Sequence, residues 1–460
     1  MKEVLVNFKS SSYINESSKD YSLYVLENRG IPSVWDGLKD GQRKALFLLQ
    51  NRAGEIKTIS LAGEMISSGL YVHGDAAAAE SIGKLAAPYL NNMPLIKGIG
   101  GFGTKTVPTA ISAPRYTYVK KSSVTEKVLF PDHEVLEMQE NYDGSAFSPS
   151  HYAPLIPTVL LNGVSGMAPG FSTNILPRSF KGLVKATLDV LNGKLPSTLT
   201  PCYESCAGDV VSLGDSRYAF YGVAKVLDAQ TVHVSELPPG MSHESFIEKL
   251  NDMCDNNIIK NYTDDTADKI NITVKFIRGS ISTWTDDTAI ANFNLVTRDK
   301  DRIVVINWDG KTVKEYDSAA GLVIEYVQKR FSYYVKRFER LRKIDTEKLQ
   351  FELLIKACLE SDILDRLKTF KNKAELYKEI EIVAQNKNLT VTEQDINSAC
   401  SLPTYRWTVE ELKPVEEKIS SLSSNIVNYN TILNDDEKIW NIYREEVSAL
   451  LKEKFNSGRE

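Results

Sequence analysis

The sequence of 460 residues predicts a multidomain α+β protein. Three patterns indicate this class: two helical segments followed by a glycine-rich β-type segment, a later alternation of strand-like and helix-like segments, and two apolar heptad stripes towards the end. A chain of this length accommodates about two to four domains. Changes in pattern divide it into a polar arm over residues 1–20 and domains over 21–148, 149–320 and 321–460.

The first domain, residues 21–148, opens with short helical segments that break at Gly30 and Gly37. The stretches "TISLAGEMISSGLY" and "DAAAAESIGKLAAPYL" then predict two helices joined by a glycine-containing turn, with Asp75 placed to cap the second helix. The glycines of "GIGGFG" are not a dinucleotide-binding fingerprint, because a helix precedes them and β-type sequence follows. Two helices followed by a glycine-rich hairpin predict a winged helix, which is a DNA-binding module.

The hairpin of this domain carries "TAISAPRYTYVKK", which holds an arginine and two tyrosines. Tyr, Thr and Val favour strands, so propensity alone predicts a strand with Tyr116 and Tyr118 on one face and Arg115 on the other. The other interpretation makes one of the tyrosines a nucleophile. These residues alone leave both interpretations open.

The distribution of charge is more informative than the total. The net charge of -5 does not indicate a polyanionic partner. Between residues 97 and 127, however, the only acid is Glu126, and the cations are Lys97, Lys105, Arg115, Lys120, Lys121 and Lys127. A basic cluster in an acidic chain favours contact with phosphate, so we expect Lys105 and Lys120 to bind DNA. A solvated basic loop is the alternative.

The five scattered cysteines are typical of a reducing compartment. Cys202 and Cys206 have no second Cys or His pair at zinc spacing, so we expect no metal site there. The N-terminal sequence shows no cleavage pattern, and no apolar run reaches the roughly 18 residues that a spanning helix needs. We therefore expect a soluble cytoplasmic protein with no membrane partner.

The second domain, residues 149–320, alternates between the two kinds of element, as in "SFKGLVKATLDVLNG", "ITVKFIRG" and "DRIVVINWDGKTVKEY". This alternation predicts a mixed α/β domain. The stretch "RDKDR" places Asp299 and Asp301 two residues apart, as in some metal sites. Because no acidic partner motif accompanies them, we favour a solvated hairpin turn over a metal site.

The last domain, residues 321–460, has the most regular pattern, with apolar residues at alternating spacings of 3 and 4. The stripes are Ile324, Val327, Phe331, Tyr334, Phe338 and Leu341, then Leu412, Val415, Ile419, Leu422, Ile426, Tyr429 and Leu433. We expect one long helix leading out, a small helical globule, and a second helix returning antiparallel as a coiled coil. The apolar tip predicts dimerisation, and an ordinary helical bundle is the alternative.

In this order, the predicted elements resemble the breakage-reunion region of type IIA DNA topoisomerases, from Tyr21 onward. "ENRGIPSVWDGLKDGQRKAL" is similar to the opening motif of that family, and "YVHGD" to its His-Gly-acid turn. "GIGGFG" and "APRYTY" are similar to its glycine loop and its catalytic Arg-Tyr pair. "PTVLLNGVSGMAPGFSTNILP" resembles the segment whose apolar tip wedges into DNA. The resemblance is closest to the medium subunits of T-even-type phage topoisomerases.

The resemblance implies a catalytic group. Tyr116 takes the place of the nucleophile, with Arg115 beside it on the phosphate, and Tyr118 returns to the role of a strand former. A phenol with an ordinary pKa of about 10 is a weak nucleophile at neutral pH, so neighbouring groups are needed. His73 is implied as a hydrogen-bond donor or proton relay, and a packed turn histidine is its alternative.

The resemblance also implies how DNA is held. Arg29, Lys39 and Arg43 correspond to residues that anchor the backbone near the break. Met167 stands where the family places an apolar wedge that unstacks a base step and bends the duplex. For Met167 the alternative is a buried turn residue.

The implied function is DNA cleavage and resealing through a transient 5′-phosphotyrosine link, within ATP-dependent passage of double-stranded DNA. The implied architecture adds a tower domain over residues 149–320 and a C-terminal gate, within 321–460, through which the chain forms a homodimer. Magnesium and ATP are implied on a partner ATPase/TOPRIM subunit of one or two chains, since this sequence has no phosphate-binding loop and no suitable acidic cluster. The alternative function is a non-catalytic architectural protein that binds DNA by its winged helix and dimerises through a coiled coil.

Overall fold

The structure is a computed structural model that describes residues 18, 22, 25–141, 144–196, 199–361, 363–366, 370, 372–455 and 457–458. The chain forms two compact units, Met1–Arg330 with Arg444–Glu460, and Phe331–Tyr443. Most of the predicted arm, residues 1–20, lies outside the described residues. Among the helices that are described, none is long and apolar enough to cross a membrane.

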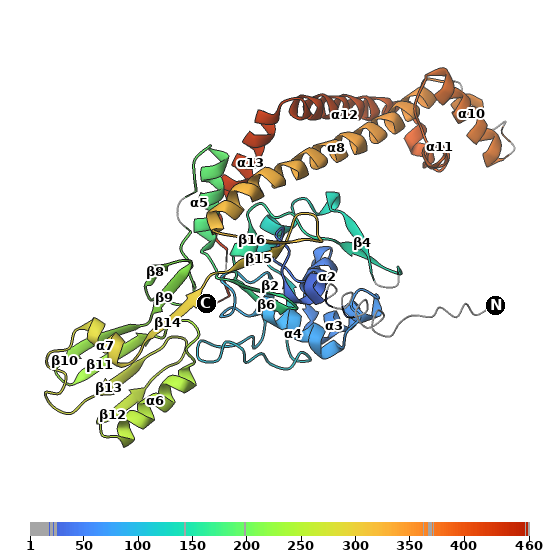
Figure 1. Cartoon of the computed structure of the whole chain (residues 1–460). Helices are drawn as coiled ribbons and strands as arrows, with labels where there is room; N and C mark the ends of the chain where they lie inside the picture. Colours follow the sequence, from blue (N-terminus) through green and yellow to red (C-terminus); the bar gives the residue numbers. More distant parts are fainter. Residues whose placement is uncertain are drawn as a thin grey trace, which may run out of the picture. The chain divides into compact units, whose positions relative to one another are not determined.

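The first part of the larger unit combines helices with a small sheet (Figure 1). Strand β3 is central in this sheet and runs antiparallel to both of its neighbours, so the glycine-rich segment and the segment after the Arg-Tyr pair form the predicted hairpin. The elements are η1 (Leu26–Gly30), α2 (Asp40–Gln50), β1 (Ile56–Lys57), α3 (Thr58–Ser67), α4 (Asp75–Ala86), β2 (Ile96–Ile99), β3 (Tyr118–Lys121), η2 (Thr125–Leu129) and η3 (His133–Val135).

Helices α3 and α4 form the predicted pair. Their buried faces carry Leu61 and Met65 on one helix and Ala78 and Ile82 on the other, at the spacings of a helical stripe. The prediction that Asp75 caps α4 is wrong. Gly74 is the capping residue, and Asp75 begins the helix with its Oδ1 accepting the N–H of the next residue at 2.9 Å.

Three hairpins, the short helix η4 and helix α5 complete this part of the larger unit. Asn174 on β7 forms an isolated antiparallel bridge with Arg302, just before β15, and Ser33 bridges to Ile306 on β15. These bridges bring the N-terminal segment next to residues that come much later in the sequence, over a small core that includes Leu26 and Val304. The elements are β4 (Met138–Glu140), β5 (Phe147–Pro149), η4 (Thr158–Leu160), β6 (Val164–Ala168), β7 (Phe171–Ile175), α5 (Phe180–Leu191), β15 (Ile303–Ile306) and β16 (Val313–Tyr316).

The mixed α/β segment contains two further antiparallel sheets. One has the strand order β14-β9-β8, and the other has the order β10-β11-β13-β12 with α6 and α7 packed on one face (Figure 1). Alternation along β11 and β13 buries Val232, Val234, Ile272 and Val274 against these helices. The elements are β8 (Val210–Gly214), β9 (Arg217–Tyr221), β10 (Val223–Asp228), β11 (Thr231–Glu236), α6 (His243–Asp255), β12 (Asn261–Asp264), β13 (Ile272–Lys275), α7 (Asp286–Asn292) and β14 (Val296–Lys300).

The expectation that Asp299 and Asp301 form a solvated turn is wrong for Asp301. Only 8% of Asp301 is exposed, and its carboxylate pairs with the guanidinium of Arg178, which is 1% exposed. Asp301 Oδ1 also accepts the N–H of Leu176 at 3.0 Å. Asp299 lies on β14 and is exposed. Asp301 therefore closes a buried ion pair that ties β14 to the segment before α5.

The smaller unit is helical. The long outgoing helix and the returning helix are confirmed as α8 and α12, and buried Leu354, Cys358, Ile380 and Ile396 form the core of the globule between them. The returning helix was predicted as one helix, but α12 ends before Asn434 and a separate helix, α13, follows. The elements are α8 (Ala319–Leu359), α9 (Ile363–Arg366), α10 (Lys373–Asn386), α11 (Glu393–Ala399), η6 (Thr404–Trp407), η7 (Val409–Glu411), α12 (Leu412–Leu433) and α13 (Asp436–Leu450).

Contacts along α8 and α12 show that the two helices are antiparallel. The Phe338 and Tyr429 rings lie 6.2 Å apart, whereas at the far end Lys356 Nζ lies 2.7 Å from Glu416 Oε1. Between these contacts Asp345 is buried and accepts a hydrogen bond from Asn425 at 3.2 Å. A buried polar group between paired helices favours one register over others.

Candidate functional site

Tyr116 lies on a turn and not on a strand, because β3 begins only at Tyr118. The prediction of a strand over the whole "RYTYV" stretch is therefore wrong for its first residues. The Tyr116 N–H donates to the carbonyl of Ala113 at 2.9 Å, which closes the turn. Tyr116 is 68% exposed and Tyr118 is 38% exposed, so the first tyrosine is the more accessible of the two.

The turn is held against the start of α3. Thr117 is buried, its Oγ1 lies 2.8 Å from Thr58 Oγ1, and its carbonyl accepts the Thr58 N–H at 3.0 Å. The next residue of the helix, Ile59, donates its N–H to the carbonyl of Pro114 at 3.2 Å. Anchored on both sides, the turn presents the phenol of Tyr116 with its backbone held in place.

Arg115 lies beside the Tyr116 ring, with its Cζ 4.7 Å from the ring centroid. This is the distance of a cation–π contact. The guanidinium can leave the ring for phosphate oxygens, because an exposed contact of this kind is worth only about 0.5–1 kcal/mol. The structure thus brings together the two members of the predicted Arg-Tyr pair.

A cleft of about 580 Å³ lies between α2, α4 and the segment leading into β6. It is lined by three predicted site residues, Arg29, Lys39 and His73. The structure therefore places Arg29, Lys39 and His73 around one cleft, whereas Arg43 and Tyr116 are not among its lining residues.

Arg29 and His73 are in direct contact. One guanidinium nitrogen of Arg29, Nη2, lies 2.8 Å from His73 Nδ1 and 2.7 Å from Nε2. Burial, and then the positive charges of Arg29 and Lys44, lower the pKa of His73 from its usual value. His73 is consequently neutral at neutral pH, so one ring nitrogen can accept a hydrogen bond from Arg29.

This contact predicts how His73 titrates. In the chain without DNA we expect its pKa below the usual value of about 6.5, so that it gains a proton only at more acidic pH than an ordinary histidine. Arg29→Gln should raise this pKa by removing a nearby positive charge, and Lys44→Gln should raise it less. The measurement is an NMR titration of the imidazole signals, with His73→Gln to assign the resonance. A pKa above 6.5 in the unmodified chain would contradict the prediction.

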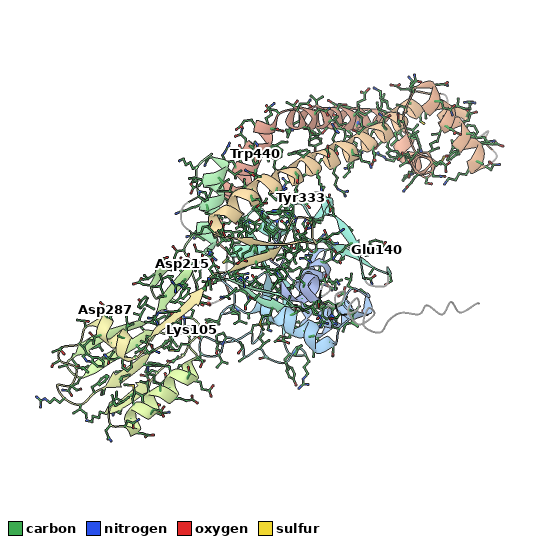
Figure 2. The ribbon with its side chains drawn as sticks, in the orientation of Figure 1. Lys105, Glu140, Asp215, Asp287, Tyr333 and Trp440 are labelled. Carbon is green, nitrogen blue, oxygen red and sulfur yellow. The ribbon has the colours of Figure 1, made fainter. Side chains whose placement is uncertain are left out.

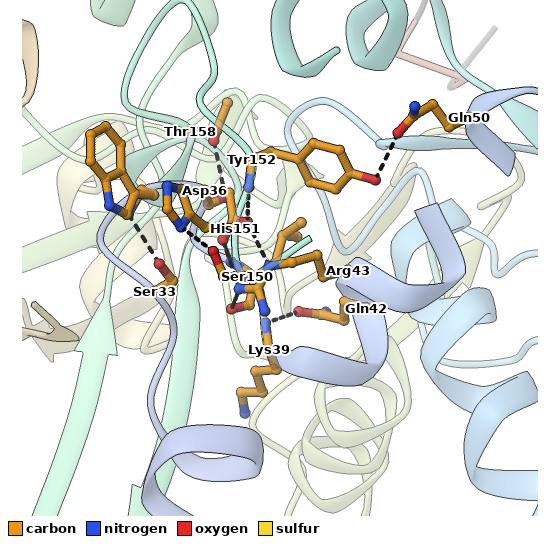
Figure 3. Close-up of polar contacts among 12 residues, drawn as sticks. Ser33, Asp36, Lys39, Gln42, Arg43, Gln50, Ser150, His151, Tyr152 and Thr158 are labelled. Carbon is orange, nitrogen blue, oxygen red and sulfur yellow. Dashed lines mark hydrogen bonds and ion pairs between the residues drawn. The ribbon is translucent and has the colours of Figure 1, made fainter. Parts of the chain in front are cut away.

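Lys39 is the residue directly before helix α2. Its N–H donates to Gln42 Oε1 at 2.9 Å, and its Nζ donates to the carbonyl of Ser165 at 3.2 Å. Burial, and then the charge of Lys84, lower the pKa of Lys39 from its usual value. The side chain extends away from the polar network around Asp36 (Figure 3) and reaches the cleft.

Arg43 is not available to DNA, which corrects its predicted role. It is 5% exposed, and its Nε donates to Asp36 Oδ2 at 2.8 Å (Figure 3). The same carboxylate accepts the N–H groups of Leu38 at 3.0 Å and Tyr152 at 2.9 Å. Arg43 therefore stabilises the loop that presents Lys39, and its guanidinium is already paired with Asp36.

The predicted DNA-binding role of Lys105 also conflicts with the structure. Lys105 lies in the segment between β2 and β3 (Figure 2), and its Nζ is 2.7 Å from Glu236 Oε1. The two side chains are 11% and 9% exposed, so the ammonium is committed to this pair. Lys120 on β3 differs, because its Nζ lies 2.9 Å from Glu55 and both side chains remain partly exposed. Of the two predicted lysines, only Lys120 offers its charge to solvent.

Met167 is 83% exposed on β6, so the alternative of a buried turn residue is wrong. The hairpin that carries it packs tightly on the segment that carries Arg29. A Cβ added to Gly30 would lie 2.8 Å from the Met167 carbonyl, and one added to Gly166 would lie 1.9 Å from the Gly30 carbonyl. Both contacts require glycine, so the hairpin and the Arg29 segment touch backbone to backbone.

No group of three or more His, Cys, Asp or Glu side chains suited to a metal ion occurs in the part of the chain that the structure describes.

Two further residues, Glu80 and Lys84, line the cleft from α4, and neither was predicted as a site residue from the sequence. The sequence does carry a signal for this shared face, which is helical spacing. Residues of α4 on the cleft follow it: Ala77, Glu80, Ser81 and Lys84. The role of Asp36 as the centre of the buried network was not predicted either. That role depends on the backbone N–H of Tyr152, which is 116 residues away in sequence.

Comparison with known proteins identifies relatives along most of the chain. The family of DNA gyrase/topoisomerase IV A subunits matches residues 29–448. The DNA topoisomerase medium subunit of Enterobacteria phage T4 is 32% identical over 430 residues, which cover 90% of this chain and 93% of that protein. The DNA topoisomerase 2 of Bombyx mori is 29% identical over 455 residues, and the match spans 93% of this chain and 29% of the insect protein.

A solved structure shows the same fold. The crystal structure of the Plasmodium falciparum topoisomerase II DNA-binding, cleavage and re-ligation domain superposes with a TM-score of 0.84. The match covers 96% of this chain and 64% of that one, at 21% identity. The mixed α+β architecture with several sheets is thereby confirmed.

Proposed function

The chain belongs to the family of DNA gyrase/topoisomerase IV A subunits, as a DNA-cleaving and resealing subunit of a type IIA topoisomerase that works with an ATPase partner, and we propose that Tyr116 is the residue that becomes joined to DNA. The observation that carries this assignment is the Arg115–Tyr116 pair. It stands exposed on an anchored turn, with the guanidinium 4.7 Å from the ring.

In the proposed reaction the Tyr116 oxygen attacks a backbone phosphorus in line with the 3′ oxygen. The new bond is a phosphotyrosine ester at the 5′ end, the P–O3′ bond breaks, and the phenol proton ends on the released 3′ hydroxyl. Arg115 supplies a planar fork of donors to the non-bridging oxygens, where charge increases in the transition state. Resealing reverses these steps, and because the ester retains the bond energy it needs no nucleotide.

We assign the cleft to the DNA backbone. Arg29 and Lys39 bring positive charge to it, and His73, which contacts Arg29, lines it as well. Both ring nitrogens of His73 lie within 2.8 Å of Arg29 Nη2, so His73 would donate to a phosphate oxygen only after its ring turns away from Arg29. Lys120 would add a contact with the DNA backbone outside the cleft, since it lies on the sheet next to the Tyr116 turn.

The finer architecture is also proposed. Residues 21–148 would be the winged-helix domain, 149–320 the tower domain, and 321–460 the stalk with a dimerisation gate. We propose a homodimer through this gate, and a partner ATPase/TOPRIM subunit that holds magnesium and ATP. When bound, the magnesium ion would offset charge at the leaving oxygen. The proposed location is the cytoplasm, on the nucleoid or in a host cell.

Met167 is proposed as the wedge that bends the duplex. Its exposed, unbranched side chain can enter a base step without rearranging the hairpin. We expect Met167→Ala to reduce bending by at least half, as measured by fluorescence resonance energy transfer between the ends of a labelled duplex, and to leave folding unchanged. Leu195→Ala is the control, since Leu195 is 84% exposed. Equal bending by both variants would exclude Met167 as the wedge.

The experiment that tests the assignment is a covalent adduct assay. The chain, its partner subunit, magnesium and duplex DNA are mixed and then denatured, and protein is sought on the 5′ ends. An adduct on Tyr116 supports the proposal. DNA bound without any adduct would favour the architectural alternative.

A further inference from the structure

Glu80 and Lys84 lie one turn apart on α4 and both face the cleft. Lys84 Nζ is 2.6 Å from Glu80 Oε1, and the two side chains are 57% and 62% exposed. An exposed ion pair of this kind contributes little to stability, because water solvates both groups and screens their attraction. The pair can therefore exchange partners at little cost.

The charges around Lys84 favour an anion as the new partner. Lys39 and Lys84 line the same cavity, and the charge of Lys84 adds to burial in lowering the pKa of Lys39. Two ammonium groups that act on each other in this way are both stabilised by an anion bound between them. A DNA phosphate in the cleft would serve this purpose.

Two other acids that line the cleft are already paired. Asp36 Oδ2 accepts from Arg43 Nε at 2.8 Å, and Asp40 Oδ2 lies 2.6 Å from Lys44 Nζ. These pairs are buried or nearly so, with side-chain exposures of 6% and 0% for the first and 13% and 14% for the second. Glu80 is thus the carboxylate placed to compete with an incoming phosphate for a cleft lysine.

We propose that Lys84 is a further phosphate ligand of the cleft, and that Glu80 holds it until DNA displaces the carboxylate. This inference rests on the proposed function, because it takes the cleft to be the face that binds the DNA backbone. Glu80 then weakens binding to any polyanion, because DNA must displace its carboxylate from Lys84 before a phosphate can bind there.

The test measures the affinity of the full chain for a duplex of about 30 base pairs over a range of salt concentrations. Loss of one phosphate contact lowers the slope of log K against log salt by about 1. We expect this for Lys84→Gln, with weaker binding at each salt concentration. Lys84→Arg should keep the slope of the unmodified chain. Glu80→Gln should tighten binding several-fold, and this gain should disappear in the Glu80→Gln/Lys84→Gln double variant.

Lys356→Gln is the matched control, because Lys356 forms a pair of similar length with Glu416 on the helical stalk. The proposal is overturned if Lys84→Gln has the same slope as this control, or if Glu80→Gln tightens binding equally with and without Lys84. Should Lys84→Gln fail to fold, Glu80→Gln and Lys84→Arg still decide the question. The covalent adduct assay on the unmodified chain separates the two ideas. If Lys84→Gln changes the slope but the unmodified chain forms no adduct on Tyr116, the cleavage assignment fails and the phosphate contact stands.

Discussion

The Tyr116→Phe variant is expected to form no covalent complex with DNA. It lacks the hydroxyl oxygen that would bond to phosphorus, while the ring, its contact with Arg115 and the anchored turn all remain. Removing a nucleophile lowers a reaction rate by about four orders of magnitude or more, since the groups around it cannot replace the bond it makes. The measurement is the fraction of labelled 5′ ends that carry protein after denaturation of the complex with the partner subunit.

Tyr118→Phe is the matched control for this result. Tyr118 opens β3, pairs in the sheet with Lys57 and Ile99, and presents its ring to the Lys57 ammonium at 5.9 Å. Its hydroxyl has no role in the proposed reaction, so adduct formation should continue. If Tyr116→Phe still formed the adduct and Tyr118→Phe did not, the assignment would pass to the second tyrosine.

The Asp301→Asn variant should destabilise the larger unit by about 3–5 kcal/mol, the usual cost of leaving one member of a buried ion pair without its partner. Arg178 and Asp301 are 1% and 8% exposed, so water cannot replace the lost carboxylate charge. Arg178 would keep the carbonyl oxygens of Leu176 and Leu199 as acceptors, and neither of these carries a full negative charge. The measurement is equilibrium unfolding in urea, followed by tryptophan fluorescence.

Asp299→Asn provides the comparison for Asp301→Asn. Asp299 is exposed and accepts from Asn174 at 2.9 Å, a bond that an asparagine oxygen can also accept, so we expect a change below about 1 kcal/mol. Adding Arg178→Met to Asp301→Asn removes the stranded charge and should recover part of the loss. Equal destabilisation by the two asparagine variants would show that the burial of Asp301 does not matter.

Elements with a strong local pattern were predictable from the sequence. The stripe through Tyr334 and Phe338 marked a real helix, α8, because a long apolar repeat leaves few other structures possible. The helices on either side of "YVHGD" were found for the same reason. The exposed tyrosine was located only by resemblance, since propensity favours a strand where the structure has a turn held by Thr58.

Roles that depend on distant partners were not predictable. Lys105 looks like a DNA ligand because it lies in a basic stretch, but its partner Glu236 is 131 residues away. Arg43 looks like a DNA ligand by resemblance, and only the folded loop shows that its guanidinium is paired with Asp36. Asp301 looked solvated because its partner, Arg178, is 123 residues away. A lone sequence shows which side chains carry charge, and only the folded chain shows whether that charge is already neutralised.

The backbone contact between Gly30 and Gly166 has a consequence for how break points are selected. If Met167 bends the duplex and the cleft binds its backbone, as proposed, this tight contact between the hairpin and the Arg29 segment would couple bending of the duplex to the position of the bound phosphates. Under the proposed function, flexible pyrimidine–purine steps would therefore be cut more readily than stiff A-tracts, even where no base edge is read. Selectivity of this kind would come from the deformability of the DNA and not from direct contacts with its bases.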